Sequence, residues 1–206
     1  MTVAMTAAMT ADRPLRPARH PRPEHSARRP VSALIAAALL ALSACSSTGV
    51  PDGIQPVQGF DAARYRGTWY EIARLDHRFE RGLEAVSAEY ANREGGGLRV
   101  ANRGWSIEDR AWRTVEGRAR FEQDPRTGHL GVSFFGPFFG SYVIFDLDPG
   151  YQQAFVTGDD RDTLWFLART PVVSEEDMAR FEARTTALGF DLDGLIRVDQ
   201  TRNAMR

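Results

Sequence analysis

Between residues 68 and 170 the chain reads as a series of short strands, and this pattern constrains the fold more than any other feature. Apolar and polar residues alternate within each segment, and turn sequences such as Gly95-Gly96-Gly97 and Asp148-Pro149-Gly150 separate them. The predicted strands span residues 68–75, 84–93, 98–105, 111–122, 129–136, 141–148, 151–157 and 163–170. Many short, regularly spaced strands are typical of an all-β sandwich or barrel.

The fourth predicted strand favours a barrel with space inside it. On its apolar face Gly117 and Ala119 stand where a solid core would need leucine or isoleucine. Small inward residues leave a void, and eight antiparallel strands can close into a barrel that holds one small ligand. The expected fold is therefore all-β, an eight-stranded antiparallel up-and-down β-barrel.

The last predicted strand is apolar on both faces, so its outer face needs a cover. Ser174 and Asp177 form a capping-box pattern, and Met178 and Phe181 follow at helical spacing. Gly189 stands where a glycine ends a helix. We therefore expect one C-terminal α-helix packed on the outside of the barrel. A helical turn over 60–65 and a short final strand over 195–198 complete the expected elements.

Residues 1–44 have the features of a signal peptide. Arginines precede an apolar run over 31–42, which is too short to span a bilayer, where about 20 residues are needed. Leu42-Ser43-Ala44-Cys45 resembles the lipobox of bacterial lipoproteins, in which cleavage precedes an acylated cysteine. Arg28-Arg29 is also compatible with a twin-arginine signal. Cys45 is therefore the predicted lipidation site, and residues 45–59 are expected to form a flexible tether before a barrel domain over 60–206.

The composition of the mature chain excludes several classes of function. Six of the 26 basic residues and two of the 27 acidic residues lie in the leader, so its removal leaves a net charge of about −5. A protein with this charge is not built to bind nucleic acid. Cys45 is the only cysteine, so once it is lipidated no thiol remains for a disulfide, a metal or catalysis. Membrane attachment is then expected through the acyl anchor.

The barrel pattern and four local segments resemble the lipocalin family. The first segment is Gly67-Thr68-Trp69, continuing to residue 74, and the others span 76–83, 132–138 and 160–165. The resemblance is closest to a branch of bacterial outer-membrane lipoproteins related to apolipoprotein D. The family's second motif is matched only imperfectly, by residues 148–151. Ser46 lacks the aspartate that retains such lipoproteins in the inner membrane, which implies a periplasm-facing protein anchored in the outer membrane.

The resemblance implies a structural role for three residues. Gly67 and Trp69 belong to the first motif of the family, and Arg169 fits the position of the arginine that stacks on the motif tryptophan. A guanidinium over an indole is a cation–π contact of roughly 0.5–2 kcal/mol. We expect this contact to close the narrow end of the barrel.

Strand parity predicts the residues that line the barrel. The candidate ligand-binding residues are Glu71, Ala73, Val86, Ala88, Tyr90, Val100, Asn102, Phe121, Phe134, Tyr142 and Trp165. This lining is mostly apolar with a few polar groups, which is typical of a small-molecule pocket. Residues 142–145 are apolar on both faces, so the parity of the sixth strand stays open.

Glu71 has two interpretations. An inward carboxylate is costly unless it is paired or protonated. Glu71 either anchors the head group of a ligand or is satisfied by a tyrosine or an arginine at the barrel floor.

Two loops are candidates for the entrance. Residues 134–140 place four phenylalanines around Gly136-Pro137, and they form either an apolar rim for an acyl chain or bilayer, or a bulged strand pair with core phenylalanines. The charged loop 76–82 is a candidate lid.

Together these features predict a binding protein and not an enzyme. His77 and His129 have no partners at metal-ligand spacing, and no catalytic motif is present. We expect no cofactor, and a fatty acid or lysophospholipid as ligand, for storage, transport or scavenging. The alternatives are a structural or assembly factor with a filled barrel, and an enzyme that acts on lipids with Glu71 as base. Family members can dimerise, but no feature of this sequence requires a homodimer.

Overall fold

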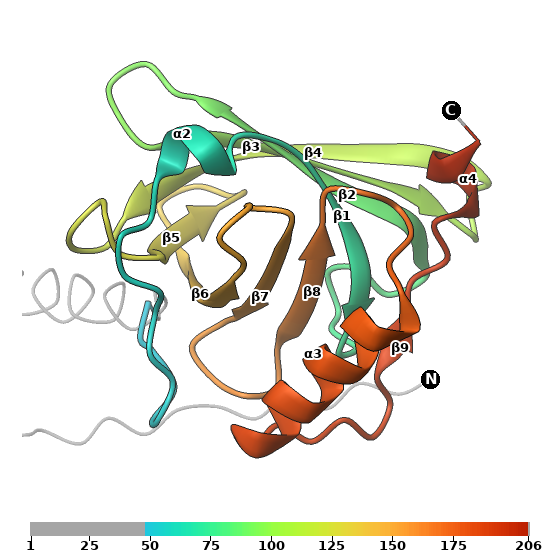
Figure 1. Ribbon diagram of the computed structural model, residues 1–206. Helices are drawn as coiled ribbons and strands as arrows, with labels where there is room; N and C mark the ends of the chain where they lie inside the picture. The colour runs from blue at the N-terminus through green and yellow to red at the C-terminus, as the bar shows by residue number, and fades with distance from the viewer. Residues whose placement is uncertain (1–47, 206) are drawn as a thin grey trace, which may run out of the picture. The chain divides into compact units, whose positions relative to one another are not determined.

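The computed structural model describes residues 48–205, so the predicted signal peptide and Cys45 lie outside the described residues. The described part forms the expected barrel (Figure 1). Its strands are β1 (Gly67–Arg74), β2 (Leu83–Asn92), β3 (Leu98–Ser106), β4 (Ala111–Phe121), β5 (His129–Ser133), β6 (Gly140–Leu147), β7 (Gln153–Thr157) and β8 (Leu164–Ala168). Each strand pairs antiparallel with its neighbours, and β1 pairs with both β8 and β2, which closes the barrel. The predicted strands and their order are confirmed.

The helices and the short last strand complete the described chain. α2 (Ala62–Tyr65) precedes β1, α3 (Glu175–Ala187) follows β8, β9 (Ile196–Arg197) pairs with the end of β1, and α4 (Thr201–Ala204) comes last. Ser174 and Asp177 form the predicted capping box of α3, and Gly189 takes the positive φ of a helix end. α4 has no counterpart among the predicted elements.

The up-and-down order of the strands gives the barrel two different ends. α2 and the turn between β6 and β7 lie at one end, which we call the closed end. The loops 75–82, 107–110, 134–139 and 158–163 lie at the other end, which we call the mouth. Alternation along the strands then sends side chains either into the barrel or onto its outer surface.

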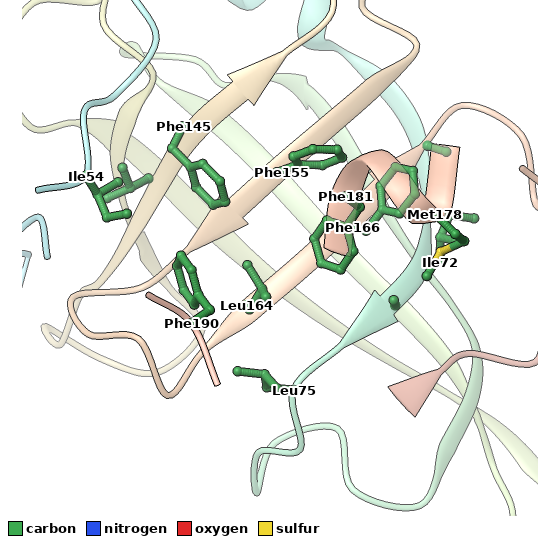
Figure 2. Packing of buried hydrophobic residues seen from close by; sticks show 13 residues of the cluster. Ile54, Ile72, Leu75, Phe145, Phe155, Leu164, Phe166, Met178, Phe181 and Phe190 are labelled. Carbon is green, nitrogen blue, oxygen red and sulfur yellow. The ribbon is translucent and has the colours of Figure 1, made fainter. Parts of the chain in front are cut away.

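α3 covers an apolar patch on the outer surface of the barrel. Met178 and Phe181 of the helix pack against Ile72 of β1 and Phe166 of β8. Figure 2 shows these side chains together with those of β6 and β7, in the gap between helix and strands. The ring of Phe181 stacks on Phe166, with 5.1 Å between their centroids. The helix therefore covers the outward apolar face of β8, as the sequence predicted.

The expectation of a flexible tether over 45–59 is wrong for residues 48–59. Ile54 is buried in the cluster under α3 and lies beside Phe145 (Figure 2). Val57 adds backbone hydrogen bonds to Ile144 and Gly128, and Gln58 bridges to Thr127. The mostly polar composition of this segment predicted a tether, yet its three aliphatic side chains, Val50, Ile54 and Val57, all pack against the barrel.

The closed end is sealed by Trp69 and Arg169. The indole is fully buried, and its Nε1 donates to the backbone oxygen of Tyr65 at 2.8 Å. The guanidinium carbon of Arg169 lies 4.0 Å from the centroid of this indole. The same guanidinium donates to the backbone oxygens of Arg64, Arg66, Thr68 and Tyr151.

Two features require a glycine at position 67, namely its backbone conformation and the closeness of Arg169. Its φ is +96°, a conformation that residues with a side chain rarely adopt. A Cβ at this position would also lie 3.3 Å from Arg169 Nη1. Glycine therefore lets the chain enter β1 directly beneath the arginine.

Arg169→Ala should lower the free energy of unfolding by about 2–4 kcal/mol, because the cation–π contact and the hydrogen bonds to the backbone are lost together. Ligand affinity should change little, since the contact lies at the closed end. Urea denaturation and ligand titration test this, with Arg66→Ala, an exposed arginine of the same segment, as the control. Equal stability of Arg169→Ala and the unmodified chain would contradict the structural role.

Ile54→Ala should cost about 2–4 kcal/mol, as expected for a buried isoleucine truncated in a packed core. Val172→Ala is the matched control, because Val172 is 69% exposed and its truncation should change stability by less than about 0.5 kcal/mol. If the two variants unfold at the same urea concentration, the segment 48–59 is not part of the cooperative fold.

Candidate functional site

The structure places most of the predicted lining residues on the inner face of the barrel. These are Glu71, Val86, Ala88, Tyr90, Val100, Asn102, Phe121, Phe134, Tyr142 and Trp165. The open question about the sixth strand is resolved, because Tyr142 and Ile144 join the inner cluster, while Val143 and Phe145 join the cluster under α3. Phe121 lies at the closed end, where it borders a surface hollow of about 510 Å³ with residues 59–63.

The prediction that Ala73 faces the interior is wrong. β1 carries a bulge between Glu71 and Ala73 in its pairing with β8. One extra residue reverses the parity of the strand beyond it. Ile72 and Ala73 therefore pack in the cluster under α3, and Arg74 is paired with Trp165 on the inner face.

The floor of the barrel carries a closed network of tyrosine hydroxyl groups. The hydroxyl of Tyr142 lies 2.8 Å from that of Tyr65 and accepts from that of Tyr90 at 2.8 Å. Burial is the main cause that raises the pKa of each of these hydroxyls. These phenols therefore stay neutral and satisfy one another, and the ring of Tyr65 lies 4.7 Å from that of Trp69 between centroids, tilted by 30°.

The half of the barrel nearer the mouth contains a buried charged cluster. Arg74 Nη1 donates to Glu71 Oε1 at 2.6 Å, and both side chains are almost fully buried. Arg74 Nη2 donates to the backbone oxygens of Glu80 and Leu83, so it fastens the loop 75–82 to the barrel. Trp165 Nε1 donates to Glu80 Oε2 at 3.1 Å.

His77 completes this cluster from the loop side. Its Nε2 lies 2.9 Å from Glu80 Oε2, and its ring meets Trp165 edge to face at 5.1 Å. The loop that the sequence marked as a candidate lid is thus held over the interior by Glu80 and His77. Sequence reasoning missed Arg74 because the bulge is not visible in the residue pattern, and missed Glu80 because a charged loop residue is normally solvated.

The pKa values of the two carboxyl groups of the cluster, Glu71 and Glu80, are shifted in opposite directions. Burial, followed by repulsion from Glu80, raises the pKa of Glu71 well above its usual value. Burial alone would also raise the pKa of Glu80, but hydrogen bonding and charge interactions with His77, together with hydrogen bonds from Glu71 and Trp165, lower it. Of the two carboxyl groups, the environment therefore favours the protonated form more at Glu71 than at Glu80. Of the two interpretations of Glu71, the contact observed is the one with an arginine, although this arginine lies in the same strand and not at the floor.

Above the floor, the inner face is open on the side of β2, β3 and β4. Ala88, Asn102 and Val115 form a cross-strand row on this face. Val115 points inward by register but is 36% exposed, and Ala88 and Asn102 are half-buried. Asn102 Oδ1 has no hydrogen-bond partner within residues 48–205. Val115 at the end of this row is therefore accessible to solvent, whereas Asn102 Oδ1 is buried.

Phe134 lies at the mouth against a glycine of the neighbouring strand. A Cβ on Gly117 would lie 2.6 Å from Phe134 Cδ1 and 2.7 Å from the backbone oxygen of Ser133. The small residue that the sequence associated with a void thus accommodates the loop after β5. A hollow of about 240 Å³ opens beside it, lined by residues 116–118 and 133–136.

The C-terminal segment closes the gap where β1 and β2 diverge. Gln200 Nε2 donates to the backbone oxygens of Glu71 and Val86, and Asn203 Nδ2 donates to that of Ala85. No motif in the sequence marks these two amides. They replace ladder hydrogen bonds that the bulges in β1 and β2 remove.

Two further features concern metals and membranes. Within residues 48–205, no group of three or more His, Cys, Asp or Glu side chains could hold a metal ion. In the same part of the chain, none of the helices has the length and apolarity needed to cross a bilayer.

Comparison with protein families and curated proteins identifies relatives over most of the chain. Residues 60–200 match the model of the lipocalin-like domain. The outer membrane lipoprotein Blc of Citrobacter freundii is 50% identical over 171 residues, which cover 83% of this chain and 96% of that protein. Apolipoprotein D of Mus musculus is 29% identical over 154 residues, which cover 70% of this chain and 80% of that protein.

Solved structures support the same fold. Insecticyanin of the tobacco hornworm Manduca sexta aligns with a TM-score of 0.60 at 20% identity. The alignment covers 77% of this chain and 90% of insecticyanin. At this identity the similarity concerns the barrel architecture alone.

Glu71→Gln should leave the protein at least as stable as the unmodified chain at neutral pH. A raised pKa in the folded state means that Glu71 favours folding below its unfolded pKa of about 4.3, and that this contribution is lost as the pH rises through the folded pKa. Glutamine keeps an oxygen for Arg74 and an N–H for Glu80 without titrating. The stability difference in favour of Glu71→Gln should therefore widen as the pH rises above the unfolded pKa of about 4.3.

Urea denaturation at several pH values measures this difference. Glu89→Gln is the control, because Glu89 is an exposed carboxyl on β2. A Glu71→Gln variant less stable than the unmodified chain at every pH would show that Glu71 is ionised and that its charge stabilises Arg74.

Proposed function

The chain belongs to the lipocalin-like family, and from that premise we propose that it is a lipid-anchored carrier that holds a fatty acid or a lysophospholipid in its barrel. Its place would be the periplasmic face of the outer membrane, with acylated Cys45 as the anchor. The lipoprotein relatives at 50% identity support this location. The role would be storage, transport or scavenging of lipid in the cell envelope.

One observation carries the proposal, namely the difference between the two halves of the barrel interior. At the closed end Trp69, Tyr65 and Leu130 are fully buried against one another. Toward the mouth, Val115 faces inward and is still accessible. An interior that is solid at one end and open at the other can take an extended apolar chain from the mouth.

The walls of the open half suit an acyl chain. Val132 and Phe134 are half-buried and present apolar surface above the floor, and Ala88 adds a small residue to the row that contains Val115. Burial of an acyl chain there would be favourable by about 25 cal/mol for each Å² removed from water. The tyrosine hydroxyls below already bind one another and offer little to a second polar group.

The polar groups of the interior lie on the mouth side and favour one orientation of the ligand. Arg74 Nε and Asn102 Oδ1 are buried atoms without a hydrogen-bond partner among the described residues. Arg74 can attract a carboxylate or a phosphate, and Asn102 can accept from a hydroxyl or an ammonium group. The tail of the ligand would then point to the floor, and its head group would lie near the mouth.

The alternatives make different demands on the interior. A structural factor would need the row formed by Ala88, Asn102 and Val115 to be filled by the protein's own side chains. An enzyme that uses Glu71 as base would need this carboxyl to reach its substrate, whereas it contacts Arg74 and Glu80 beneath a loop. We therefore favour the carrier, which requires no chemistry from Glu71.

Val115→Trp should weaken binding of a fatty acid or lysophospholipid at least about tenfold, because an indole would fill the accessible part of the interior. Val172→Trp, which adds the same indole to an exposed external position, should leave the affinity unchanged. Native mass spectrometry and displacement of a fluorescent fatty acid from residues 46–206, which contain every strand, measure the effect. Absence of a one-to-one adduct in the folded, unmodified protein would favour the filled barrel, and turnover of lysophospholipid that Glu71→Gln abolishes would favour the enzyme.

A further inference from the structure

The tyrosine hydroxyls at the floor of the barrel contain one hydrogen more than their network uses. Tyr90 donates to Tyr142, and one further hydrogen bond joins the hydroxyls of Tyr142 and Tyr65, both at 2.8 Å. Each phenol carries one O–H hydrogen and can also accept. These two bonds use two of the three hydrogens, so one has no acceptor within residues 48–205. What the floor offers to a second polar group is therefore a single donor.

The phenols of the floor keep their hydrogens at neutral pH. Burial is the main cause that raises the pKa of Tyr65, Tyr90 and Tyr142. An ionised phenol would supply an acceptor in place of a donor. Because the pKa of each is raised, the free donor is present under the conditions in which a ligand would bind.

Tyr142 is the tyrosine that can present the free hydrogen to the interior. Tyr65 and Tyr90 are 1% and 4% exposed, and the ring of Tyr65 packs against those of Trp69 and Tyr90. Tyr142 is only half-buried. Either hydroxyl of the pair Tyr65 and Tyr142 can be the donor. When Tyr65 donates, Tyr142 accepts from both neighbours and its own hydrogen points away from the network.

The wall above Tyr142 leaves room for a ligand to reach this hydroxyl. Side chains alternate between the two faces of a strand, so the next inward position of β6 toward the mouth is Gly140. Outside the adjoining residues, the nearest atom that a Cβ on Gly140 would meet is the backbone oxygen of Val132, at 4.0 Å. Val132, which pairs with Gly140, is half-buried and apolar. Tyr142 therefore lies where the solid floor meets the open half of the interior.

The surroundings of this donor suit a neutral oxygen atom and not a carboxylate. Arg74, the buried cation of the interior, lies in the half nearer the mouth and is paired with Glu71. At the closed end, Arg169 contacts Trp69 and donates to backbone oxygens. A buried carboxylate without a paired cation is costly, whereas a neutral hydroxyl or carbonyl oxygen needs only a hydrogen bond.

We propose that Tyr142 selects lipids whose acyl chain carries a neutral oxygen, as a hydroxyl or keto group, in the part that reaches the floor. The inference rests on the proposed function, in which the head group lies near the mouth and the tail points to the floor. It names a subclass of the ligands of that carrier. The Tyr142 hydroxyl donates to the oxygen of the chain, and the apolar walls bury the rest of the chain. An unsubstituted chain occupies the same space but leaves the donor without an acceptor.

A set of hydroxypalmitates, with the hydroxyl at successive positions from the α to the ω carbon, tests the selection. Displacement of a fluorescent fatty acid from residues 46–206 measures the affinities. In the unmodified protein, at least one isomer with a distal hydroxyl should bind as tightly as palmitate or more tightly. In Tyr142→Phe the same isomer should bind at least about tenfold more weakly than palmitate, because its hydroxyl is then buried without a partner. The affinity for palmitate itself should change less than about threefold.

Tyr70→Phe is the matched control, because Tyr70 is half-buried in the cluster under α3, on the outer side of the barrel wall. This variant should leave the ratio of hydroxypalmitate affinity to palmitate affinity unchanged. The inference is overturned if Tyr142→Phe also leaves that ratio unchanged for every isomer. It is equally overturned if α-hydroxypalmitate is the isomer that Tyr142→Phe rejects, because the head group would then lie at the floor.

Infrared spectroscopy supplies a readout that needs no variant. The ligand is palmitate with an isotope-labelled keto group at the position of the preferred hydroxyl, bound to the unmodified protein. A hydrogen bond from Tyr142 should lower the frequency of the keto stretch relative to the same ligand in an alkane solvent. An unshifted band would overturn the inference, even if Tyr142→Phe did not fold.

Palmitate separates this inference from the proposed function. If neither palmitate nor any hydroxypalmitate binds to the folded protein, the carrier is contradicted and the selection with it. If palmitate binds and the affinity ratios are equal in Tyr142→Phe and the unmodified protein, the selection alone is contradicted.

Discussion

The contact between Arg169 and Trp69 is the one on which the rest of the barrel depends. One guanidinium covers the indole and binds carbonyl groups from the segment before β1, from β1 itself and from the turn after β6. Backbone oxygens at the end of a barrel have lost the ladder partners that they have inside a sheet, and an arginine can satisfy several of them in one plane.

The bulge in β1 decides what the open half contains. Without it, Ala73 would face inward and Arg74 would face the apolar cluster under α3. With it, Arg74 and the carboxyl group of Glu71 lie inside the barrel, and a loop closes over them through Glu80 and His77. Buried charges of this kind persist only where they are paired, and they make the mouth polar while the floor is aromatic and apolar. This polarity along the barrel axis gives an amphipathic ligand a preferred direction.

In the proposed carrier, the N-terminal segment is the part of the fold that leads to the anchor. Residues 48–59 pack on the barrel wall and are therefore part of the fold, not a flexible linker. An acyl anchor on Cys45, as proposed, would limit the distance between the barrel and the bilayer to the few residues before that point.

The sequence by itself determined the strands, their up-and-down order, the covering helix with its caps, and the residues that close the barrel. These features follow from local rules, namely period-two alternation, turn residues, capping patterns and a tryptophan at the start of a strand. The tertiary structure alone decided the placement of Ala73 and Arg74, the lid contacts of Glu80 and His77, the amides of Gln200 and Asn203, and the docking of residues 48–59. Each of these depends on an irregularity or on a contact between distant segments. A single extra residue in a strand changes the faces of all residues beyond it while leaving the composition of the segment unchanged.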